Sequence, residues 1–252
     1  MRTNPLRRLV TGGGTIVGGW LTTESRYLAE VMSHAGFDAV TVDLQHGMFG
    51  IDTAIGLLQA VSAGPATPLA RCASHDPAVI GKLLDASAYG IICPDVGSAA
   101  EAAAFVAACR YPPIGHRSFG PSRGLLYGGP DDLEHADSEI LTWAMIESAE
   151  ALASLDAILA VSGLDGVYVG PNDLALSIGE KAGQSPVPAS VRTALEIIVV
   201  AAHAAGRWAG AFCADGPSGR ELVELGYDFV TPGNDVAQLR AVTADRIRTV
   251  RG

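Results

Sequence analysis

The 252-residue sequence has only four cysteines, and no two of them are closely spaced. They stand at Cys72, Cys93, Cys109 and Cys213, without the CxxC spacing that would indicate a structural zinc site or a disulfide framework. We interpret them as small core residues of a protein in a reducing compartment.

Basic residues are also scarce. Seventeen Lys and Arg stand against 27 Asp and Glu, which gives a formal net charge of −10. This charge disfavours nucleic acid or an anionic membrane surface as a partner. An anionic substrate would need its own local cations.

Long apolar runs are missing. No stretch reaches the ~18 uninterrupted apolar residues of a membrane-spanning helix. The N-terminal residues 1–20 contain arginines and an apolar run but no small-residue cleavage site of a signal peptide. We therefore expect no membrane partner and a cytoplasmic location.

Two common catalytic motifs are absent as well. Without a GK[ST] or HExxH element, the sequence gives no support for a phosphate-binding loop or a zincin. The glycines of GGGTIVGG (12–19) precede an expected strand instead of following one, so they fit turns and bulges better than a nucleotide-binding loop.

What the sequence does contain is a series of eight short apolar runs. Continuous runs of this length are typical of parallel strands that are covered on both faces. They occupy residues 15–21, 38–44, 67–73, 89–95, 141–147, 165–171, 207–213 and 227–233.

Helical patterns separate these runs. Eight strands alternating with helices, without a Gly/Ser linker or a shift in composition, predict one (β/α)8 TIM barrel, an α/β fold, as a single domain over residues 1–252. Two Gly- and Pro-rich segments, 111–140 and 179–188, interrupt the alternation near the barrel mouth or its flank. The clearest helical patterns are at 25–36, 76–90, 98–110, 148–163 and 188–206.

Polar residues stand where several of the expected strands end. In a (β/α)8 barrel the C-terminal strand ends converge on one face, where active sites form. Each residue alone could equally be a helix cap or a loop hydrogen-bonding group, but their joint placement predicts an active site. They are Asp43, Gln45, His46, Arg71, Asp95, Glu147 and Asp173.

Two of these acids predict a divalent-metal site. Glu147 and Asp173 follow adjacent strands, and two carboxylates leave several positions of an octahedral cation free for water and substrate oxygens. The alternative is a pair of structural acids near helix caps.

Arg71 and His46 indicate the chemistry at the same face. A guanidinium in an apolar strand needs a partner, which is either Asp43 in an internal salt bridge or an oxygen of the substrate. His46 is the only histidine at a strand end and could accept a proton near neutral pH. The Gly-Pro turn of VGPND (169–173) adds backbone N–H groups for an anionic carboxylate.

Several segments resemble the successive motifs of the HpcH/HpaI aldolases, a family of metal-dependent pyruvate aldolases. The match runs in order from about residue 15 to 235, and its RYPPxGxRxxG and GPxDL elements are specific. The segments are GFDAVTVDLQHG, RCASHDPAVIGKLLDASAYGIICPDV, RYPPIGHRSFG, MIESAEAL and GLDGVYVGPNDLALSIG.

The resemblance implies a (β/α)8 barrel that binds Mg²⁺ or Mn²⁺, with Co²⁺ and Zn²⁺ as further candidates. It implies reversible cleavage of 4-hydroxy-2-oxo acids to pyruvate and an aldehyde, and a homo-hexamer, a trimer of dimers, with an exchanged C-terminal helix. Carried over by motif, His46 is the general base, Arg71 stabilises the transition state, and Glu147 and Asp173 are metal ligands. Substrate contacts fall on Gln45, Met145, Gly170, Pro171, Asn172 and Asp173.

The resemblance also assigns a role to Asp85, as the acid that raises the basicity of the histidine. Asp85 lies about eight residues into the helix after the third strand, hence ~12 Å from its own barrel mouth at 1.5 Å per residue. We therefore expect it to serve His46 of a neighbouring subunit.

Two positions depart from the family pattern. Gln45 stands where the family usually has Glu, and Met145 where it usually has Gln, so the mouth is less acidic and more apolar. This indicates a shifted aldehyde preference. The only lysines, Lys82 and Lys181, fall on a helix and in a loop, which argues against a covalent imine mechanism.

Two other functions remain open. A citrate-lyase-β-like CoA-ester lyase would share the barrel, the metal acids and the arginine, but should have more basic residues around its mouth than Arg117 and Arg123. The other is a non-catalytic barrel that binds a metal or a keto acid, which the presence of His46 and Arg71 disfavours.

Overall fold

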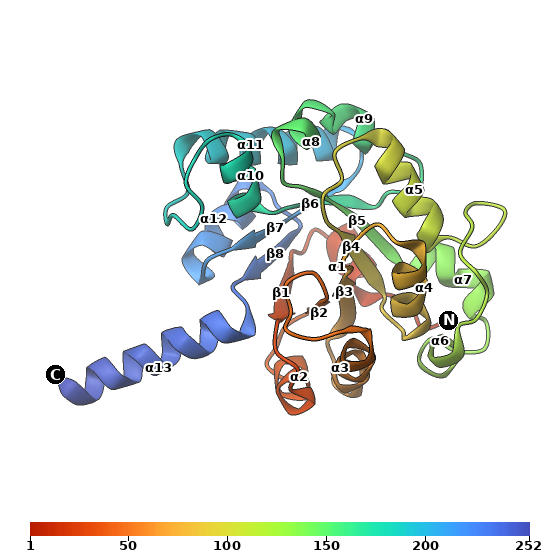
Figure 1. Cartoon of the computed structure of the whole chain (residues 1–252), viewed down its shortest axis with the longest axis horizontal. Coiled ribbons are helices and arrows are strands. Elements are labelled where there is room, and N and C mark those ends of the chain that lie inside the picture. The colour runs from red at the N-terminus through yellow and green to blue at the C-terminus, as the bar shows by residue number, and fades with distance from the viewer.

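The computed structural model describes residues 1–252, and its eight parallel strands close into a barrel in sequence order (Figure 1). Each strand pairs with the next, and the eighth pairs with the first. The predicted (β/α)8 barrel is confirmed. The strands are β1 (Ile16–Leu21), β2 (Ala39–Asp43), β3 (Thr67–Arg71), β4 (Gly90–Cys93), β5 (Leu141–Ile146), β6 (Gly166–Val169), β7 (Trp208–Cys213) and β8 (Phe229–Pro232).

Most strands end one or two residues earlier than their apolar runs predict. The fourth strand stops at Cys93, because the N–H of Asp95 donates to the carboxylate of Glu147 instead of to a neighbouring strand (2.7 Å). The polar residues at the mouth therefore lie at or just beyond the ends of the ladder, where their side chains are free to turn toward one another.

The helices surround the barrel, and four of the five predicted ones are present with shorter bounds. The pattern at 148–163 is instead broken at Ser154 into two short helices. The helices are α1 (Pro5–Thr11), α2 (Arg26–Ser33), α3 (Ile51–Ala63), α4 (Pro77–Asp85), α5 (Ala99–Cys109), α6 (Ser122–Tyr127), α7 (Asp132–Glu139), α8 (Ala149–Ala153), α9 (Leu155–Leu159), α10 (Pro171–Ser177), α11 (Ala189–Ala204), α12 (Gly216–Leu225) and α13 (Asp235–Arg251).

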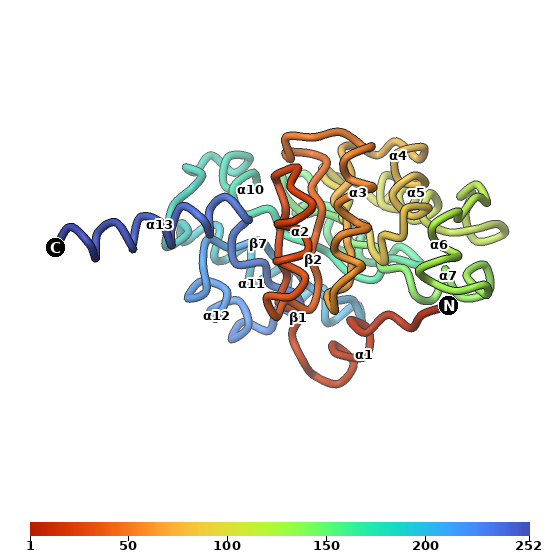
Figure 2. The backbone as a smooth tube through the Cα atoms, turned by 90° about the horizontal axis from the view of Figure 1, so that it is seen from below, coloured from red at the N-terminus to blue at the C-terminus, as the bar shows by residue number.

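The Gly- and Pro-rich segment 111–140 contains α6 and α7 and lies on the flank of the barrel, close to the N-terminus (Figure 2). The side-chain amide of Asn4 is buried and donates to the carbonyl oxygens of Tyr89 (3.2 Å) and Glu139 (2.8 Å). The N-terminal ammonium pairs with Asp131. These long-range contacts hold the segment against the end of the barrel opposite the mouth.

Aromatic and aliphatic side chains fill the barrel interior, so it is a packed core and not a channel. Phe229 lies edge-on to both Trp143 and Tyr168, with ring centroids 5.5 and 5.3 Å apart. From helix α1, Leu6 and Val10 join the same cluster. Helix α1 therefore closes the N-terminal end of the barrel and leaves the C-terminal end as the open face.

Helix α13 projects away from the barrel in both views (Figures 1 and 2). Its first residue, Asp235, is buried and accepts hydrogen bonds from the backbone and hydroxyl groups of Thr22 and Thr23. Apolar side chains along the helix are 39% to 87% exposed, namely Val236, Leu239, Val242, Ile247 and Val250. None of the helices combines the length and the apolar character needed to cross a bilayer.

The packing of α1 predicts that Leu6→Ala destabilises the protein. The side chain of Leu6 is 1% exposed, and truncation of such a residue costs ~2–5 kcal/mol because it leaves a cavity. Urea unfolding of the variant should show this loss. Arg8→Ala, on the exposed face of the same helix, should change stability by less than about 0.5 kcal/mol. Equal stability of Leu6→Ala and the parent protein would contradict the role of α1 as a plug.

Candidate active site

A buried ion pair between Asp43 and Arg71 lies at the mouth, where β2 and β3 end. The guanidinium donates from Nε to Oδ1 (2.8 Å) and from Nη2 to Oδ2 (2.6 Å), and the indole N–H of Trp20 also donates to Oδ2 (3.1 Å). Arg71 lies 5.0 Å from the centroid of the Trp20 ring. Of the two partners that the sequence left open for Arg71, the structure contains the internal one, Asp43.

The ion pair determines the charge of the Asp43 carboxyl. Burial alone would raise the pKa of the Asp43 carboxyl, but the hydrogen bonds and charge of Arg71 outweigh it, so this pKa lies below its usual value. Asp43 is therefore an anion at neutral pH and cannot serve as a general acid. Arg71 keeps its charge in a site that is largely shielded from water.

Asp43 also shapes the turn that follows β2. Its Oδ1 accepts the backbone N–H groups of Gln45 (3.0 Å) and His46 (3.2 Å). The carbonyl oxygen of Asp43 accepts the N–H of Gly47, so close that a side chain at residue 47 would clash with it. The imidazole of His46 is exposed and has no hydrogen-bond partner in the chain, whereas Oε1 of Gln45 is buried without one.

Glu147 forms the second half of the site. It follows β5, is 4% exposed, and uses Oε1 to accept the N–H of Asp95, while Oε2 accepts no hydrogen bond. Burial raises its pKa to about 7, opposed by the bond from Asp95 and reinforced by the negative charges of Asp95 and Asp173. The charge of Arg71 also lowers this pKa, but Arg71 is hydrogen-bonded to Asp43 and not to Glu147, so the effect of burial prevails.

The start of α10 lies directly against Glu147. A Cβ at Gly170 would lie 2.5 Å from Oε2 of Glu147 and 3.1 Å from the terminal methyl carbon of Met145, so only glycine allows this approach. Met145 is 2% exposed and belongs to the barrel interior. Pro171 is the first residue of α10, and Asp173 lies exposed in its first turn. The first N–H groups of a helix have no intrahelical partner, and here they begin at Asn172 because Pro171 has no N–H.

The side chain of Asn172 is committed to the segment 179–188. Its Oδ1 accepts the N–H of Gly183 (2.9 Å), and a cavity of about 710 Å³ opens beside Pro171 and Asn172, toward α12. The side-chain oxygen of Asn172 is therefore engaged on the side of the 179–188 segment.

The acid pair fits a divalent cation. Glu147 and Asp173 are close enough for one charge to raise the pKa of the other acid, and a cation between them would relieve that repulsion. Oxygen donors are the ligands that Mg²⁺ and Mn²⁺ prefer. No third His, Cys, Asp or Glu completes a cluster, so further coordination positions would fall to water and substrate.

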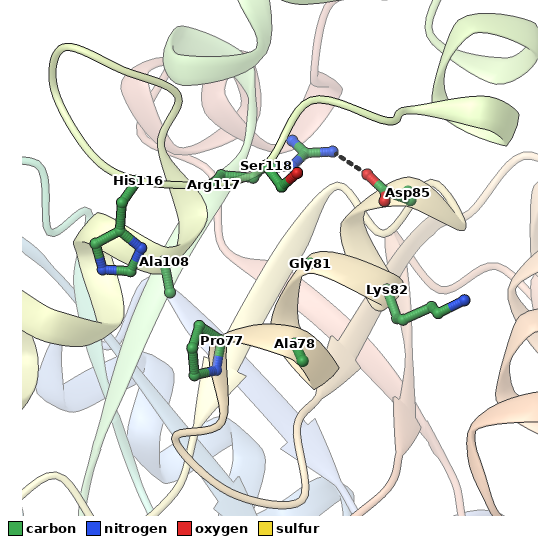
Figure 3. A pocket seen from close by; sticks show the side chains of 9 residues that line it. All are labelled: Pro77, Ala78, Gly81, Lys82, Asp85, Ala108, His116, Arg117 and Ser118. Carbon is green, nitrogen blue, oxygen red and sulfur yellow. Dashed lines mark hydrogen bonds and ion pairs between the residues drawn. The ribbon is translucent and has the colours of Figure 1, made fainter.

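Asp85 lies apart from these residues, at the C-terminal end of α4. It accepts a hydrogen bond from Nη2 of Arg117 (2.9 Å) and lines a cavity of about 390 Å³ on the barrel flank (Figure 3). It makes no hydrogen bond with His46 of the same chain, as expected from its depth in the helix.

Three contributions to the site were not predicted from the sequence. They are the indole of Trp20, the backbone N–H of Asp95 and the missing side chain of Gly170. Asp95 has a positive φ of 53°, which is uncommon for a residue other than glycine. Gly170 carried a sequence signal because it lies within the VGPND turn, and Asp95 because it is one of the polar residues at the strand ends, whereas Trp20 carried none.

A (β/α)8 barrel with a buried Arg–Asp pair, an exposed histidine and an uncompensated buried acid at its mouth has the architecture of an enzyme of the TIM-barrel class. Comparison with known proteins makes this specific. The HpcH/HpaI aldolase/citrate lyase family matches residues 17–241. The hydroxypyruvate/pyruvate aldolase of Rhizorhabdus wittichii is 40% identical over 248 residues, which are 98% of this chain and 99% of that protein.

Two further relatives agree. The 4-hydroxy-2-oxo-heptane-1,7-dioate aldolase of Salmonella paratyphi C is 36% identical over 94% of this chain and 90% of that protein. The crystal structure of an HpcH/HpaI aldolase/citrate lyase family protein from Burkholderia cenocepacia has a TM-score of 0.91 at 30% identity, over 98% of this chain and 99% of that chain. This protein belongs to the HpcH/HpaI aldolase/citrate lyase family. It is a carbon–carbon lyase of the aldolase type, and the predicted resemblance is confirmed.

The ion pair predicts a large effect of Asp43→Asn. Removing one member of a buried pair leaves an uncompensated charge and costs ~3–5 kcal/mol. Urea unfolding at neutral pH should show this loss, whereas Asp52→Asn, at the exposed start of α3, should change stability by less than about 1 kcal/mol. An unchanged stability of Asp43→Asn would exclude the pair as a structural element.

Urea unfolding of the parent protein and Asp43→Asn at low pH gives a second test of the ion pair. Because the pKa of Asp43 is lowered in the folded protein, its contribution is complete above the unfolded pKa of ~3.9 and is lost as the pH falls through the lower folded value. The stability difference between parent and Asp43→Asn should therefore stay constant from neutral pH to about 5 and shrink only below about 4.

Proposed function

We propose that this protein is a class II aldolase that cleaves 4-hydroxy-2-oxo acids reversibly to pyruvate and an aldehyde. The observation that carries this proposal is the acid pair at the mouth: Glu147 is buried, has a free oxygen and is repelled by neighbouring acids. A divalent cation, Mg²⁺ or Mn²⁺ in the first place and Co²⁺ or Zn²⁺ otherwise, is the group that this site would hold. When bound, it would supply the positive charge that stabilises an enolate.

The protein's own residues would orient the keto acid. The unpaired N–H groups at the start of α10, around Gly170 and Asn172, suit its carboxylate. Arg71 is fixed by Asp43 and cannot swing, so its guanidinium would act as a preorganised positive charge beside the keto oxygen. Gln45, whose Oε1 is buried and unpartnered, would contact the substrate at the same face.

His46 would move the proton. In cleavage, His46 takes the proton of the C4 hydroxyl and the C3–C4 bond breaks. C4 leaves as the aldehyde, and the electron pair of the broken bond forms the enolate of pyruvate. The proton then returns to C3, which gives pyruvate and leaves His46 neutral. In the addition direction, His46 removes the methyl proton and returns it to the new C4 alkoxide. An exposed, unpaired imidazole at the mouth is suited to this exchange.

The structure gives little support to the alternative chemistries. Lys82 lies in α4 and Lys181 follows α10, so no lysine reaches the barrel interior to form an imine. A CoA-ester lyase would need cations at the mouth, but Arg117 is buried against Asp85, and Arg123 donates to the carbonyl of Ala86 at the same flank. Neither arginine is free to bind a CoA phosphate at the mouth.

The departures at Gln45 and Met145 bear on the choice of substrate. Met145 ends 3.1 Å from where a side chain at Gly170 would begin, so it adds an apolar surface next to Glu147. The Rhizorhabdus wittichii relative is named for hydroxypyruvate and pyruvate. Both keto acids should therefore be tested here, and apolar aldehydes are the first acceptors to compare with polar ones.

We further propose that the chain forms one barrel domain whose helix α13 is exchanged between subunits of a homo-hexamer, a trimer of dimers. The exposed apolar side chains of α13 have no partner within the chain, and burial against a neighbour would stabilise them. Assembly would also bring Asp85 to His46 of the partner subunit, where its carboxylate would favour the protonated imidazole. Light scattering in solution tests the stoichiometry.

The metal assignment predicts an activity that depends on a cation. With Mg²⁺ or Mn²⁺, a keto acid and an aldehyde, the protein should form an aldol product, and EDTA should abolish it. Glu147→Gln and Asp173→Asn should each lower the rate ~100-fold or more because each removes an anionic ligand. Glu150→Gln, an exposed acid on α8, should not change it. Full activity in EDTA would refute the class II assignment.

The proposed sharing of the site predicts complementation between two inactive variants. His46→Asn and Asp85→Asn should each lower the rate ~10²–10⁴-fold, as expected for loss of general-base function. Co-expressed in equal amounts, they should regain about a quarter of the activity, because random pairing places an intact His46 opposite an intact Asp85 in that share of sites. No recovery in mixed oligomers would place both residues in the same chain.

A further inference from the structure

Arg117 has an unusual environment for a residue of a Gly- and Pro-rich segment. It follows α5, its side chain is only 1% exposed, and Nη2 donates to Oδ1 of Asp85 at 2.9 Å (Figure 3). Its Nε and Nη1 are buried and have no hydrogen-bond partner. A buried guanidinium with a single salt bridge is costly, because the unpaired donors have lost water without gaining another acceptor.

The surroundings of Arg117 hold it in place. The guanidinium lies 4.5 Å from the centroid of the Tyr111 ring, and the backbone N–H of Arg117 donates to the carbonyl of Arg110 (2.9 Å). Asp132, from α7, is buried nearby, and the charge of Arg117 partly offsets the effect of burial on its pKa. A side chain enclosed in this way presents its Nη2 in one direction, toward α4.

Asp85 is held by only one of its two oxygens. Oδ1 accepts from Arg117, and Oδ2 has no hydrogen bond in the chain. The carboxylate is 28% exposed and lines the flank cavity of about 390 Å³, together with His116 and Ser118. One oxygen is thus anchored from inside the protein, while the other is available to a group outside it.

We propose that Arg117 is a positioning residue for the aldolase reaction. It fixes the Asp85 carboxylate so that Oδ2 meets the imidazole of His46 of the partner subunit, and it keeps that carboxylate from turning back toward its own chain. This inference rests on the proposed role of Asp85. It adds that the orientation of this acid is set by Arg117, from the segment 111–140.

The test is a double-mutant cycle between Arg117→Met and Asp85→Asn in the full-length oligomer, saturated with Mn²⁺. If Arg117 acts through Asp85, Arg117→Met should lower kcat ~10- to 100-fold in the presence of Asp85 and less than about 2-fold in the Asp85→Asn background. The KM for the 4-hydroxy-2-oxo acid should stay unchanged, because the residues that bind the keto acid lie at the mouth. A protein weakened only in its fold would lose kcat in both backgrounds.

A matched control is Arg110→Met. Arg110 is also buried and lies seven positions earlier, but it donates to the carbonyl of Ile140 and pairs with Asp165. Its effect on kcat should be the same factor in both backgrounds. If Arg117→Met does not fold, Arg117→Lys keeps the charge, displaces the donor and should give a smaller loss that likewise disappears in Asp85→Asn.

The same measurements distinguish failure of the positioning role of Arg117 from failure of the proposed role of Asp85. If Asp85→Asn itself leaves kcat unchanged, the proposed role of Asp85 fails and the positioning role fails with it. If Asp85→Asn is impaired but Arg117→Met has no effect, or has an equal effect in both backgrounds, only the positioning role is overturned.

Discussion

The mouth of this barrel depends on the buried pair of Asp43 and Arg71. Two charges are removed from water there, and each is stable only because the other is within hydrogen-bonding distance at two points. The pair joins the ends of β2 and β3 and gives the following turn its acceptor, so the position of His46 is set by the same carboxylate. An arginine held in this way keeps its charge and its orientation whether or not a substrate is present.

On the opposite side of the mouth, the negative charge of the acids is not fully neutralised within the chain. Glu147, Asp95 and Asp173 bring negative charge together around the start of α10, and the N–H of Asp95 and the charge of Arg71, which is already paired with Asp43, offset only part of it. Asp43 is hydrogen-bonded to a cation, whereas Glu147 accepts a hydrogen bond only from a backbone N–H. This contrast separates a structural acid from an acid that requires a cation from outside, and it makes the acid pair the natural place for a metal.

The chain by itself leaves groups unsatisfied away from the mouth. Helix α13 carries exposed apolar side chains into solvent, and Asp85 presents a free oxygen on the flank. Both features would be explained by a neighbouring copy, which would cover the helix and use the acid. The proposed assembly is then part of the catalytic site, because the histidine and the acid that serves it come from different chains.

The sequence by itself determined the eight-stranded barrel and indicated most of the polar residues at its mouth. Strand and helix periodicity are local properties, and the C-terminal end of a parallel strand lies at the mouth of a barrel wherever it occurs, so Arg71, Glu147 and the VGPND turn could be placed without coordinates.

Tertiary structure alone decided which residues these side chains contact. The sequence left Arg71 with two possible partners, and only the geometry of β2 and β3 selected Asp43. Arg117 meets Asp85 across 32 positions, and α6 and α7 form in a Gly- and Pro-rich segment that is tied down by contacts with the N-terminus. Such choices depend on which residues meet in space, and neither composition nor periodicity contains that information.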